Sequence, residues 1–516
     1  MNAFTTNDIM IVAAIVVYLG VMIAIGIVSS RKSKNTDDFY LGGRKLGPLV
    51  TAMSAEASDM SGWLLMGLPG LALMTGVAEA VWTAVGLAIG TYINWLVVAK
   101  RIRVYSEKID AVTIPEFFSK RFGDRKNVIS VIAALIIIVF FIPYTASGFA
   151  ACGKLFGSLF GMDYHLAMLL SAAVIVVYCA LGGFLAASTT DLIQSIVMTV
   201  ALIVVVGIGA GAVNGFGNVF ANVKELNGYL DVFKGFNVAT GATGSYGALP
   251  VASTMAWGLG YFGMPHILLR FMAIDDPSKL KMSRRIASIW VVISMGVAIL
   301  IGVVGYSLMQ QGIVGPYESA SAAETIIVDI SKFIAGKGWI AAFGAGIFIS
   351  GILASTMSTS DSQLIAASSS VTQDILVNGI GIKLSDKKLM LTARLSVVAI
   401  SVIAVFFAWN PDASVFRIVS FAWAGFGAAF GPVILCGLFW KKTTKAGALA
   451  GMIAGGGMVF LWKFVIAKLG GIFAIYELLP AFIFALIVIV VVSLISAKPE
   501  KEISDTFDKV KAELKQ

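Results

Sequence analysis

Two carboxylates stand inside an apolar stretch of the chain. Residues 54–70 read SAEASDMSGWLLMGLPG, within a run at 47–75 that is apolar on both flanks. A charge at the centre of a bilayer costs ~2.5–3.5 kcal/mol on insertion scales, so we interpret Asp59 as functional. We expect Glu56 near an aqueous vestibule. The serines, glycines and proline predict a break over 57–62, whose freed carbonyls suit a hard cation such as sodium and whose freed amides suit a carboxylate.

A second apolar run is interrupted in the same way. The run at 250–271 contains WGLGYFGMPH at 257–266, in which Gly258, Gly260, Gly263 and Pro265 cluster at mid-span. Irregular backbone at membrane depth occurs where it lines a cavity or is buried in protein. Two such interruptions five helices apart indicate the site of a secondary transporter. The alternative is that the glycines only allow close helix packing.

A row of hydroxyls lies in a third apolar run. Residues 355–362 read STMSTSDS. At 100° per residue, one helix face about 100° wide carries all four of Ser355, Ser358, Thr359 and Ser362. Asp361 flanks this face. Hydroxyl oxygens are neutral sodium ligands, and with carbonyls near Ala57 and Met60 they could replace the water shell of the ion. The alternative is hydroxyls that bond to their own helix.

Other polar residues give weaker signals. Asp191 follows Ser188–Thr190 at the start of an apolar run, where it could cap a helix or serve as a second cation or coupling position. The chain has 2 histidines, far apart, and 3 cysteines without disulfide or metal spacing. We therefore expect no transition-metal centre.

The elements that position these residues must be membrane helices. The chain has 516 residues, of which 58% are hydrophobic and 13% charged, and a mean hydropathy of +0.90. Runs of ~18 or more apolar residues indicate spanning helices. We predict an all-α polytopic protein with about 13 spans, near residues 9–29, 47–75, 78–99, 127–153, 166–182, 188–213, 250–271, 286–310, 338–371, 389–408, 415–439, 445–467 and 473–496.

Lysine and arginine give the orientation. With these spans, the basic clusters in loops 30–46, 100–126, 272–285, 383–388 and 441–445 and in the tail 497–516 all fall on one side. The positive-inside bias makes this side cytoplasmic, with the N-terminus outside and the C-terminus in the cytoplasm. The net charge of +9 is therefore a topology signal, and we predict no nucleic-acid partner. The tail is partly amphipathic, which predicts a short helix or disorder.

Several motifs together make the chain similar to a known family. It resembles the sodium/solute symporter family, and within it the proline-transporting members, through DDFYLGGR (37–44), SAEASDMSGWLLMGLPG (54–70), YINW (92–95), WGLGYFGMPHIL (257–268), MSTSDSQL (357–364) and AWAGFGAAFGP (422–432). The resemblance implies one membrane domain over 1–516 with a leucine-transporter-type 5+5 inverted repeat. The repeats would be 47–213 and 250–439, after an extra helix at 9–29 and before two helices within 445–496.

The resemblance also implies roles for single residues. A sodium site would consist of the backbone of Ala57 and Met60, the carbonyl of Ser355 and the hydroxyls of Ser358 and Thr359. Coupling roles fall on Asp59, Asp191 and Arg44. The substrate pocket would contain Ser61, Gly62, Tyr144, Trp257, Tyr261 and Pro265. Glu56, where the resemblance predicts glycine, and Asp361 depart from the pattern, and both add acidity around the ion pathway. We assign Asp361 to the coupling group.

The resemblance implies sodium-coupled symport of L-proline by alternating access in a bacterial cell membrane, with no cofactor and no obligate protein partner. A compact apolar imino acid suits a pocket with aromatic walls, and no buried arginine is evident to bind its carboxylate. Alternatives within transport are another amino acid, pantothenate or a sugar as solute, or coupling to protons. A transporter-like sensor, a channel and a membrane enzyme are disfavoured, because the sequence shows no long signalling domain and no nucleophile–base pair.

Overall fold

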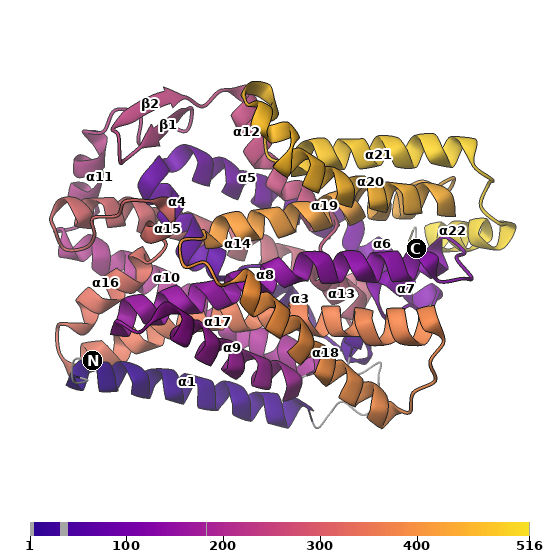
Figure 1. Ribbon diagram of the computed structural model, residues 1–516, viewed down its shortest axis with the longest axis horizontal. Helices are drawn as coiled ribbons and strands as arrows, with labels where there is room; N and C mark the ends of the chain where they lie inside the picture. The colour runs from indigo at the N-terminus through magenta and orange to yellow at the C-terminus, as the bar shows by residue number, and fades with distance from the viewer. Residues whose placement is uncertain (1–4, 31–39, 182, 515–516) are drawn as a thin grey trace.

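The computed structural model describes residues 5–30, 40–181 and 183–514, and long helices dominate it (Figure 1). The predicted basic residues Arg31, Lys32 and Lys34 and residues 37–39 of the DDFYLGGR motif lie outside the described residues. Ten helices in the described part are long and apolar enough to cross a membrane. They are α1 (Thr6–Ser30), α5 (Val77–Ile93) continuing through η3 (Asn94–Val98) into α6 (Ala99–Lys108), α8 (Val128–Phe160), α10 (Phe184–Ala212), α14 (Leu280–Gln310), α17 (Trp339–Ser369) continuing into η6 (Ser370–Ile380), α18 (Asp386–Phe407), α19 (Val415–Phe439), α20 (Lys445–Phe464) and α21 (Leu478–Ile495).

The three other predicted spans fall on shorter elements. The run at 166–182 corresponds to α9 (Tyr164–Leu181). The run at 47–75 is divided into α3 (Pro48–Ala57), the π-helical turn η2 (Trp63–Gly67) and α4 (Leu68–Thr75). The run at 250–271 is divided into α12 (Ala248–Met255), the 3-10 segment η4 (Ala256–Phe262) and α13 (Pro265–Ala273). Both predicted breaks are therefore present.

The two breaks differ in their backbone hydrogen bonds. Beyond Ala57 the helical ladder becomes irregular: the amides of Asp59 and Met60 both donate to the carbonyl of Glu56, at 3.1 and 2.9 Å, and the amide of Ser61 donates to the carbonyl of Asp59 at 2.8 Å. In the second broken helix, Met264 is extended (φ −75°, ψ 110°) immediately before Pro265, which begins α13. A residue before proline is disfavoured in helical conformation, and proline suits the first turn of a helix. The second interruption is thus a local consequence of the sequence.

Glycines bring α5 against the second broken helix. A Cβ added at Gly90 would lie 2.3 Å from the carbonyl oxygen of Gly258, and one added at Gly86 would lie 2.4 Å from that of Met255. The backbones therefore touch, as small residues allow between membrane helices. Gly258 therefore fits both interpretations of the glycines: it allows close helix packing, and it lies in the broken segment.

We expect Gly90→Ala to lower the free energy of unfolding by about 1–3 kcal/mol, the usual cost of overpacking. The methyl group would have to displace backbone, which cannot rotate away as a side chain does. Gly207→Ala on α10 is the matched control, because nothing lies within 4 Å of its added Cβ. Thermal unfolding of the purified protein in detergent measures both variants, and a Gly90 variant as stable as the Gly207 variant would contradict the contact.

Short elements cover the two ends of the bundle. One end carries α11 (Phe216–Lys224), the antiparallel pair β1 (Lys234–Asn237) and β2 (Ala242–Ser245), α15 (Ala320–Ala323) and α16 (Ile326–Ala335) (Figure 1). The other end carries α7 (Ile114–Arg121) and α22 (Lys501–Glu513). Of the two alternatives predicted for the tail, a short helix or disorder, the structure shows the helix. The start of α1 and the helix α22 lie toward opposite ends of the long axis (Figure 1).

Candidate ion and substrate site

The break in the first helix faces the hydroxyl row on α17. The hydroxyl of Ser358 donates to the carbonyl of Ala57 at 2.8 Å and lies 3.2 Å from the carbonyl of Ser355. The Thr359 hydroxyl lies 3.4 Å from the same Ala57 carbonyl. Met60 is buried in the unwound turn three residues after Ala57. The structure thus places four of the five predicted ligand groups in mutual contact, with Met60 in the adjoining turn.

The other two hydroxyls of the row do not face Ala57. The Ser355 hydroxyl donates to the carbonyl of Ile352 in its own helix at 2.8 Å. The Ser362 hydroxyl accepts a hydrogen bond from Arg270 at 2.5 Å and donates to Asp361 at 3.2 Å. The prediction of four hydroxyls on one ion is therefore wrong for Ser355 Oγ and Ser362. The helical repeat placed them on one face, but two different neighbours divide that face.

Asp59 is fully buried beside two of the predicted substrate residues. Tyr261 donates its hydroxyl to Asp59 Oδ2 at 2.8 Å, and the Tyr144 hydroxyl lies 3.4 Å from Oδ1. The main-chain carbonyl of Asp59 accepts from Tyr144 at 3.0 Å and from the indole of Trp63 at 3.0 Å. Asp59 therefore joins the unwound turn to α8 and to η4. Hydrogen bonds to an ionised carboxylate are stronger than hydrogen bonds between neutral groups.

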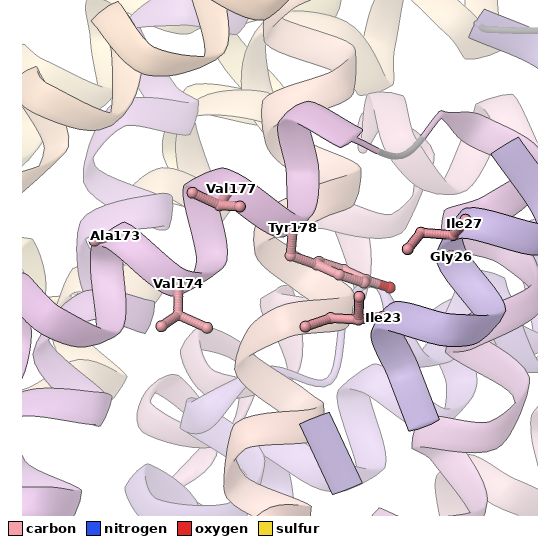
Figure 2. Close-up of a pocket in the computed structure, with 7 residues that line it drawn as sticks. All are labelled: Ile23, Gly26, Ile27, Ala173, Val174, Val177 and Tyr178. Carbon is pink, nitrogen blue, oxygen red and sulfur yellow. The ribbon is translucent and has the colours of Figure 1, made fainter. Parts of the chain in front are cut away.

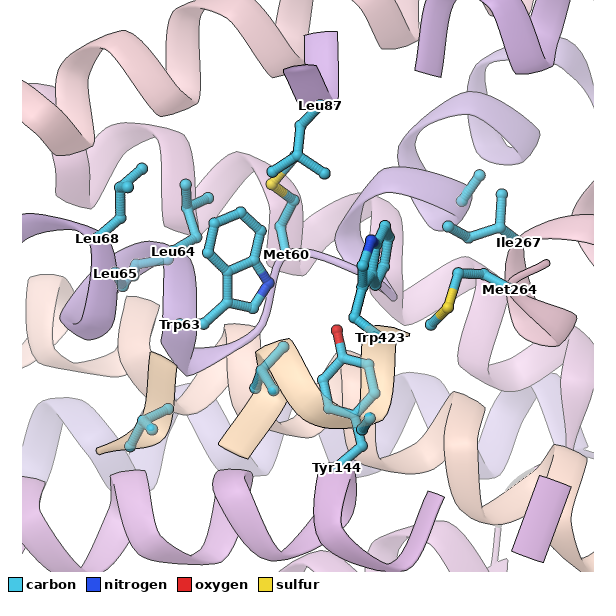
Figure 3. Close-up of a cluster of buried hydrophobic side chains, with 14 of the residues drawn as sticks. Met60, Trp63, Leu64, Leu65, Leu68, Leu87, Tyr144, Met264, Ile267 and Trp423 are labelled. Atoms are coloured by element: carbon cyan, nitrogen blue, oxygen red, sulfur yellow. The ribbon is translucent and has the colours of Figure 1, made fainter. Parts of the chain in front are cut away.

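An aromatic wall adjoins this carboxylate. The Trp257 ring lies 5.8 Å from Trp63 and 5.1 Å from Phe416, and it stacks on Tyr476 at 5.4 Å. The indole of Trp423 donates to the Trp257 carbonyl at 2.7 Å. Figure 3 shows Trp63, Tyr144 and Trp423 gathered around the unwound segment at Met60. Trp257 and Tyr261 thus line the second break, as predicted, while Phe416 and Tyr476 were not predicted.

The remaining predicted pocket residues have backbone roles. The amide of Ser61 donates to the Asp59 carbonyl at 2.8 Å. A Cβ on Gly62 would meet the Ala151 methyl at 2.9 Å, so this glycine permits contact with α8. Pro265 begins α13. Each of the three shapes the backbone of a break.

A buried ion pair joins α13 to α10. Arg270 on α13 contacts Asp191 Oδ2 at 3.2 Å, with side-chain exposures of 1% and 0%. The arginine also donates to Ser54 at 3.0 Å, and Ser54 donates to Asp191 at 2.6 Å. The guanidinium thus links two predicted coupling residues: it contacts Asp191 directly and is connected to Asp361 through the Ser362 hydroxyl.

Arg270 itself was missed by the sequence reasoning. It stands at the end of the run at 250–271, close to the basic loop 272–285. An arginine inside an apolar run could have indicated a buried ion pair. Because the basic loop 272–285 follows directly, Arg270 was not distinguished from the basic residues of that loop. Its guanidinium binds Asp191, Ser54, Ser362 and the His266 carbonyl. These partners differ from those of Asp59, which are Tyr144, Tyr261 and Trp63.

Glu56 is placed differently from the expectation. Its side chain is fully buried, so a position near an aqueous vestibule is wrong. Its Oε1 accepts from the Thr91 hydroxyl at 3.0 Å and from the Trp95 indole at 2.9 Å. The last turn of α3 is thereby attached to α5 and η3.

Arg44 lies away from the unwound turn. It donates to the carbonyl of Met272 near the end of α13 at 2.7 Å, to the Ala111 carbonyl at 2.8 Å and to Ser106 at 3.0 Å. Its bond to the Met272 carbonyl connects Arg44 to the end of α13.

The groove in Figure 2 is separate from this site. It is lined by apolar side chains of α1 and α9, among them Ile23, Val174 and Tyr178. The one hydroxyl among the described lining residues, that of Tyr178, lies 2.6 Å from the Thr190 hydroxyl, and these residues include no charged side chain. The chemistry of the molecule is concentrated at the broken helices.

The chain is similar to a known protein family and to several of its members. A family model described as "Sodium:solute symporter family" matches residues 39–455. The "Sodium/proline symporter" of Haemophilus influenzae is 42% identical and covers 97% of each chain. The "Osmoregulated proline transporter OpuE" of Bacillus subtilis is 41% identical over 95% of this chain and 96% of its own. The "Sodium/proline symporter" of Escherichia coli is 41% identical over 95% and 96%.

Solved structures share the fold. A Na+-coupled sialic acid symporter in an outward-open state has a TM-score of 0.77 at 17% identity and covers 95% of this chain and 99% of its own. A nucleobase-cation-symport-1 family transporter in a closed conformation has a TM-score of 0.52 at 14% identity, with coverage of 92% and 99%. The match across most of the sequence, with relatives above 40% identity, shows that this chain belongs to the sodium:solute symporter family.

Proposed function

We propose that the protein imports L-proline with sodium by alternating access. The observation that carries this proposal is the Ala57 carbonyl facing the Ser358 and Thr359 hydroxyls between a broken helix and α17. Uncharged oxygens from two elements bind a hard cation well. They come together only when α3 and α17 are closely packed. Three relatives that are named as proline transporters support the choice of solute.

The aromatic wall suits the ring of proline. Trp257 and Trp63 offer flat apolar surface. The hydroxyls of Tyr144 and Tyr261 lie beside this surface and contact the Asp59 carboxylate. The amides of Asp59, Met60 and Ser61 already donate to main-chain carbonyls. Since the tyrosine hydroxyls also donate to Asp59, we assign the solute carboxylate to the bound sodium, with Ser61, Gly62 and Pro265 shaping the pocket.

Coupling follows from the shared position of the two ligands. Sodium at Ala57, Met60, Ser355, Ser358 and Thr359 fixes the unwound turn that carries Asp59, and each ligand then raises the affinity for the other. We propose that Asp191, Asp361 and Arg44 connect this turn to the motion of α13. One charge moving across 100 mV yields ~2.3 kcal/mol. At ~1.4 kcal/mol per tenfold, the potential alone supports roughly fifty-fold accumulation.

We propose the topology of the family for the whole chain. It has thirteen spans with repeats at 47–213 and 250–439, one helix before them and two after. The placement of the start of α1 and of α22 at opposite ends of the bundle supports an odd number of spans. The basic residues of α6 and α7 lie at the end that holds α22, which supports a cytoplasmic C-terminus. The domain works as a single chain in the bilayer.

Uptake of radiolabelled proline into proteoliposomes tests the function. We expect uptake only with an inward sodium gradient and a stronger signal with the interior negative. Competition by other amino acids, pantothenate and sugars defines the solute, and an imposed proton gradient without sodium tests the alternative ion. Equal uptake without sodium would overturn the proposal.

The ion ligands are tested by Ser358→Ala with Thr359→Ala. We expect the sodium concentration for half-maximal uptake to rise at least about tenfold, because two of the five oxygen ligands are removed. A tenfold change in affinity corresponds to about 1.4 kcal/mol of binding free energy. Ser350→Ala is the control, since its buried hydroxyl bonds to the Gly346 carbonyl of its own helix. An unchanged sodium response in the double variant would remove the assignment.

A further inference from the structure

Glu56 attaches the first broken helix to its neighbour. The carboxylate is fully buried, and Thr91 and Trp95 both donate to one oxygen, Oε1. Among the described residues Oε2 has no hydrogen-bond partner. In this buried carboxylate one oxygen accepts two hydrogen bonds and the other accepts none from the described part of the chain. Stability alone does not explain such an arrangement, because burying a polar atom without a hydrogen-bond partner is costly.

The element that receives Glu56 has a local irregularity at the same place. η3 (Asn94–Val98) is a π-helical turn within an otherwise regular helix, and π-turns often occur at functional sites. Trp95 lies in this turn and packs on Phe271 of α13 at 4.4 Å. Asn94, its neighbour, donates to the Tyr261 carbonyl in η4 at 2.9 Å. One turn therefore holds both broken helices.

The main chain of Glu56 leads directly to the ion ligand. Its carbonyl accepts the amides of Asp59 and Met60, and the next carbonyl in the chain, that of Ala57, faces Ser358 and Thr359. A side chain that is fixed at one end and joined to this turn at the other restricts how the Ala57 carbonyl can rotate.

We propose that Glu56 is a positioning residue for the sodium site, held by Thr91 and Trp95 so that the Ala57 carbonyl points at the α17 hydroxyls. This inference rests on the proposed function. Glu56 acts by accepting hydrogen bonds through Oε1, and its charge is not what the site uses. A glutamine can accept the same two bonds, whereas a methionine of similar length can accept neither.

The test compares Glu56→Gln with Glu56→Met. Equilibrium binding of radiolabelled proline to purified protein is measured across sodium concentrations, and maximal uptake is measured in proteoliposomes at saturating sodium. We expect Glu56→Met to raise the half-saturating sodium concentration about tenfold while maximal uptake per folded protein changes by less than about threefold. Glu56→Gln should stay within about threefold of the wild type in both.

The donors provide matched variants. Thr91→Val and Trp95→Phe should each raise the half-saturating sodium concentration, and Trp95→Phe should add nothing in the Glu56→Met background. Thr83→Val is the control, because this buried hydroxyl on the same helix has no partner among the described residues. We expect it to behave as the wild type.

Each other outcome has one meaning. A Glu56→Gln variant as impaired as Glu56→Met would overturn the hydrogen-bond role, and an unshifted Glu56→Met would overturn positioning altogether. If only maximal uptake and folded yield fall, the contact is structural and the inference is wrong. A wild type that shows no sodium-dependent proline binding would instead refute the proposed function.

Discussion

Asparagine in place of Asp59 is expected to lower sodium-driven proline uptake by about a hundredfold. The carboxylate accepts from Tyr261 at 2.8 Å and lies 3.4 Å from the Tyr144 hydroxyl, in a site without exposed surface. Hydrogen bonds to a charged group contribute about 1.5–3 kcal/mol each. The single Tyr144 proton is donated to the Asp59 main-chain carbonyl, so the charge-assisted bond that asparagine weakens is the one from Tyr261. At the upper end of this range, the loss of that one bond corresponds to roughly a hundredfold.

The measurement is initial uptake in proteoliposomes at fixed sodium and potential, normalised to folded protein. Asp374→Asn is the matched control, because Asp374 is also fully buried and accepts from Thr113 at 2.8 Å, but in η6. We expect the control to affect stability and to keep the sodium dependence. Uptake by the Asp59 variant within about threefold of wild type would show that its charge is not required.

The position of Asp59 could be read from the sequence, but its partners could not. Polar and helix-breaking residues inside an apolar run predicted the break, since backbone at this depth must be satisfied by protein. Which side chains satisfy it depends on how α8, η4 and α17 pack. Tyr144 and Tyr261 came from the family resemblance, and the structure joins both to one carboxylate.

Periodicity predicted the face of α17 but not its division. A helical repeat states which residues share a side and says nothing about the neighbours that cover it. Ser358 meets α3, whereas Ser362, one turn along, meets the guanidinium of Arg270. Long-range pairing decided the difference, and this information is absent from a 3.6-residue pattern.

Glu56 shows the same limit from the opposite direction. Its cost of burial was visible in the sequence, and an aqueous vestibule was the simplest way to avoid that cost. The structure instead supplies two donors from a helix about 35 residues away along the chain. The motif YINW at 92–95 contained one of the donors, Trp95. Only the packing of α5 against α3 connects the two motifs.

The buried pair of Arg270 and Asp191 supports a second large effect. Arg270→Met is expected to lower the free energy of unfolding by about 3–5 kcal/mol, because removing one partner leaves the other charge buried and unpaired. Asp191 Oδ1 already has no partner among the described residues, and Oδ2 would retain only Ser54. Thermal unfolding in detergent measures the loss. Lys441→Met, which removes an exposed partner of Asp508, is the control and should change stability by less than about 1 kcal/mol.

The double variant Arg270→Met with Asp191→Asn separates charge pairing from packing. If the unpaired aspartate causes the damage, the double variant is more stable than Arg270→Met alone, because residues in one network couple by about 0.5–3 kcal/mol. Equal stability of the two would mean that Arg270 matters through its bonds to Ser54, Ser362 and the His266 carbonyl. In that case α13 is held to α3 and α17 by hydrogen bonds, and Asp191 is not required to hold it. If the recovered double variant still lacks sodium-driven uptake, the pair is needed for coupling as well as for folding. Asp191, Asp361 and α13 would then act through a single guanidinium.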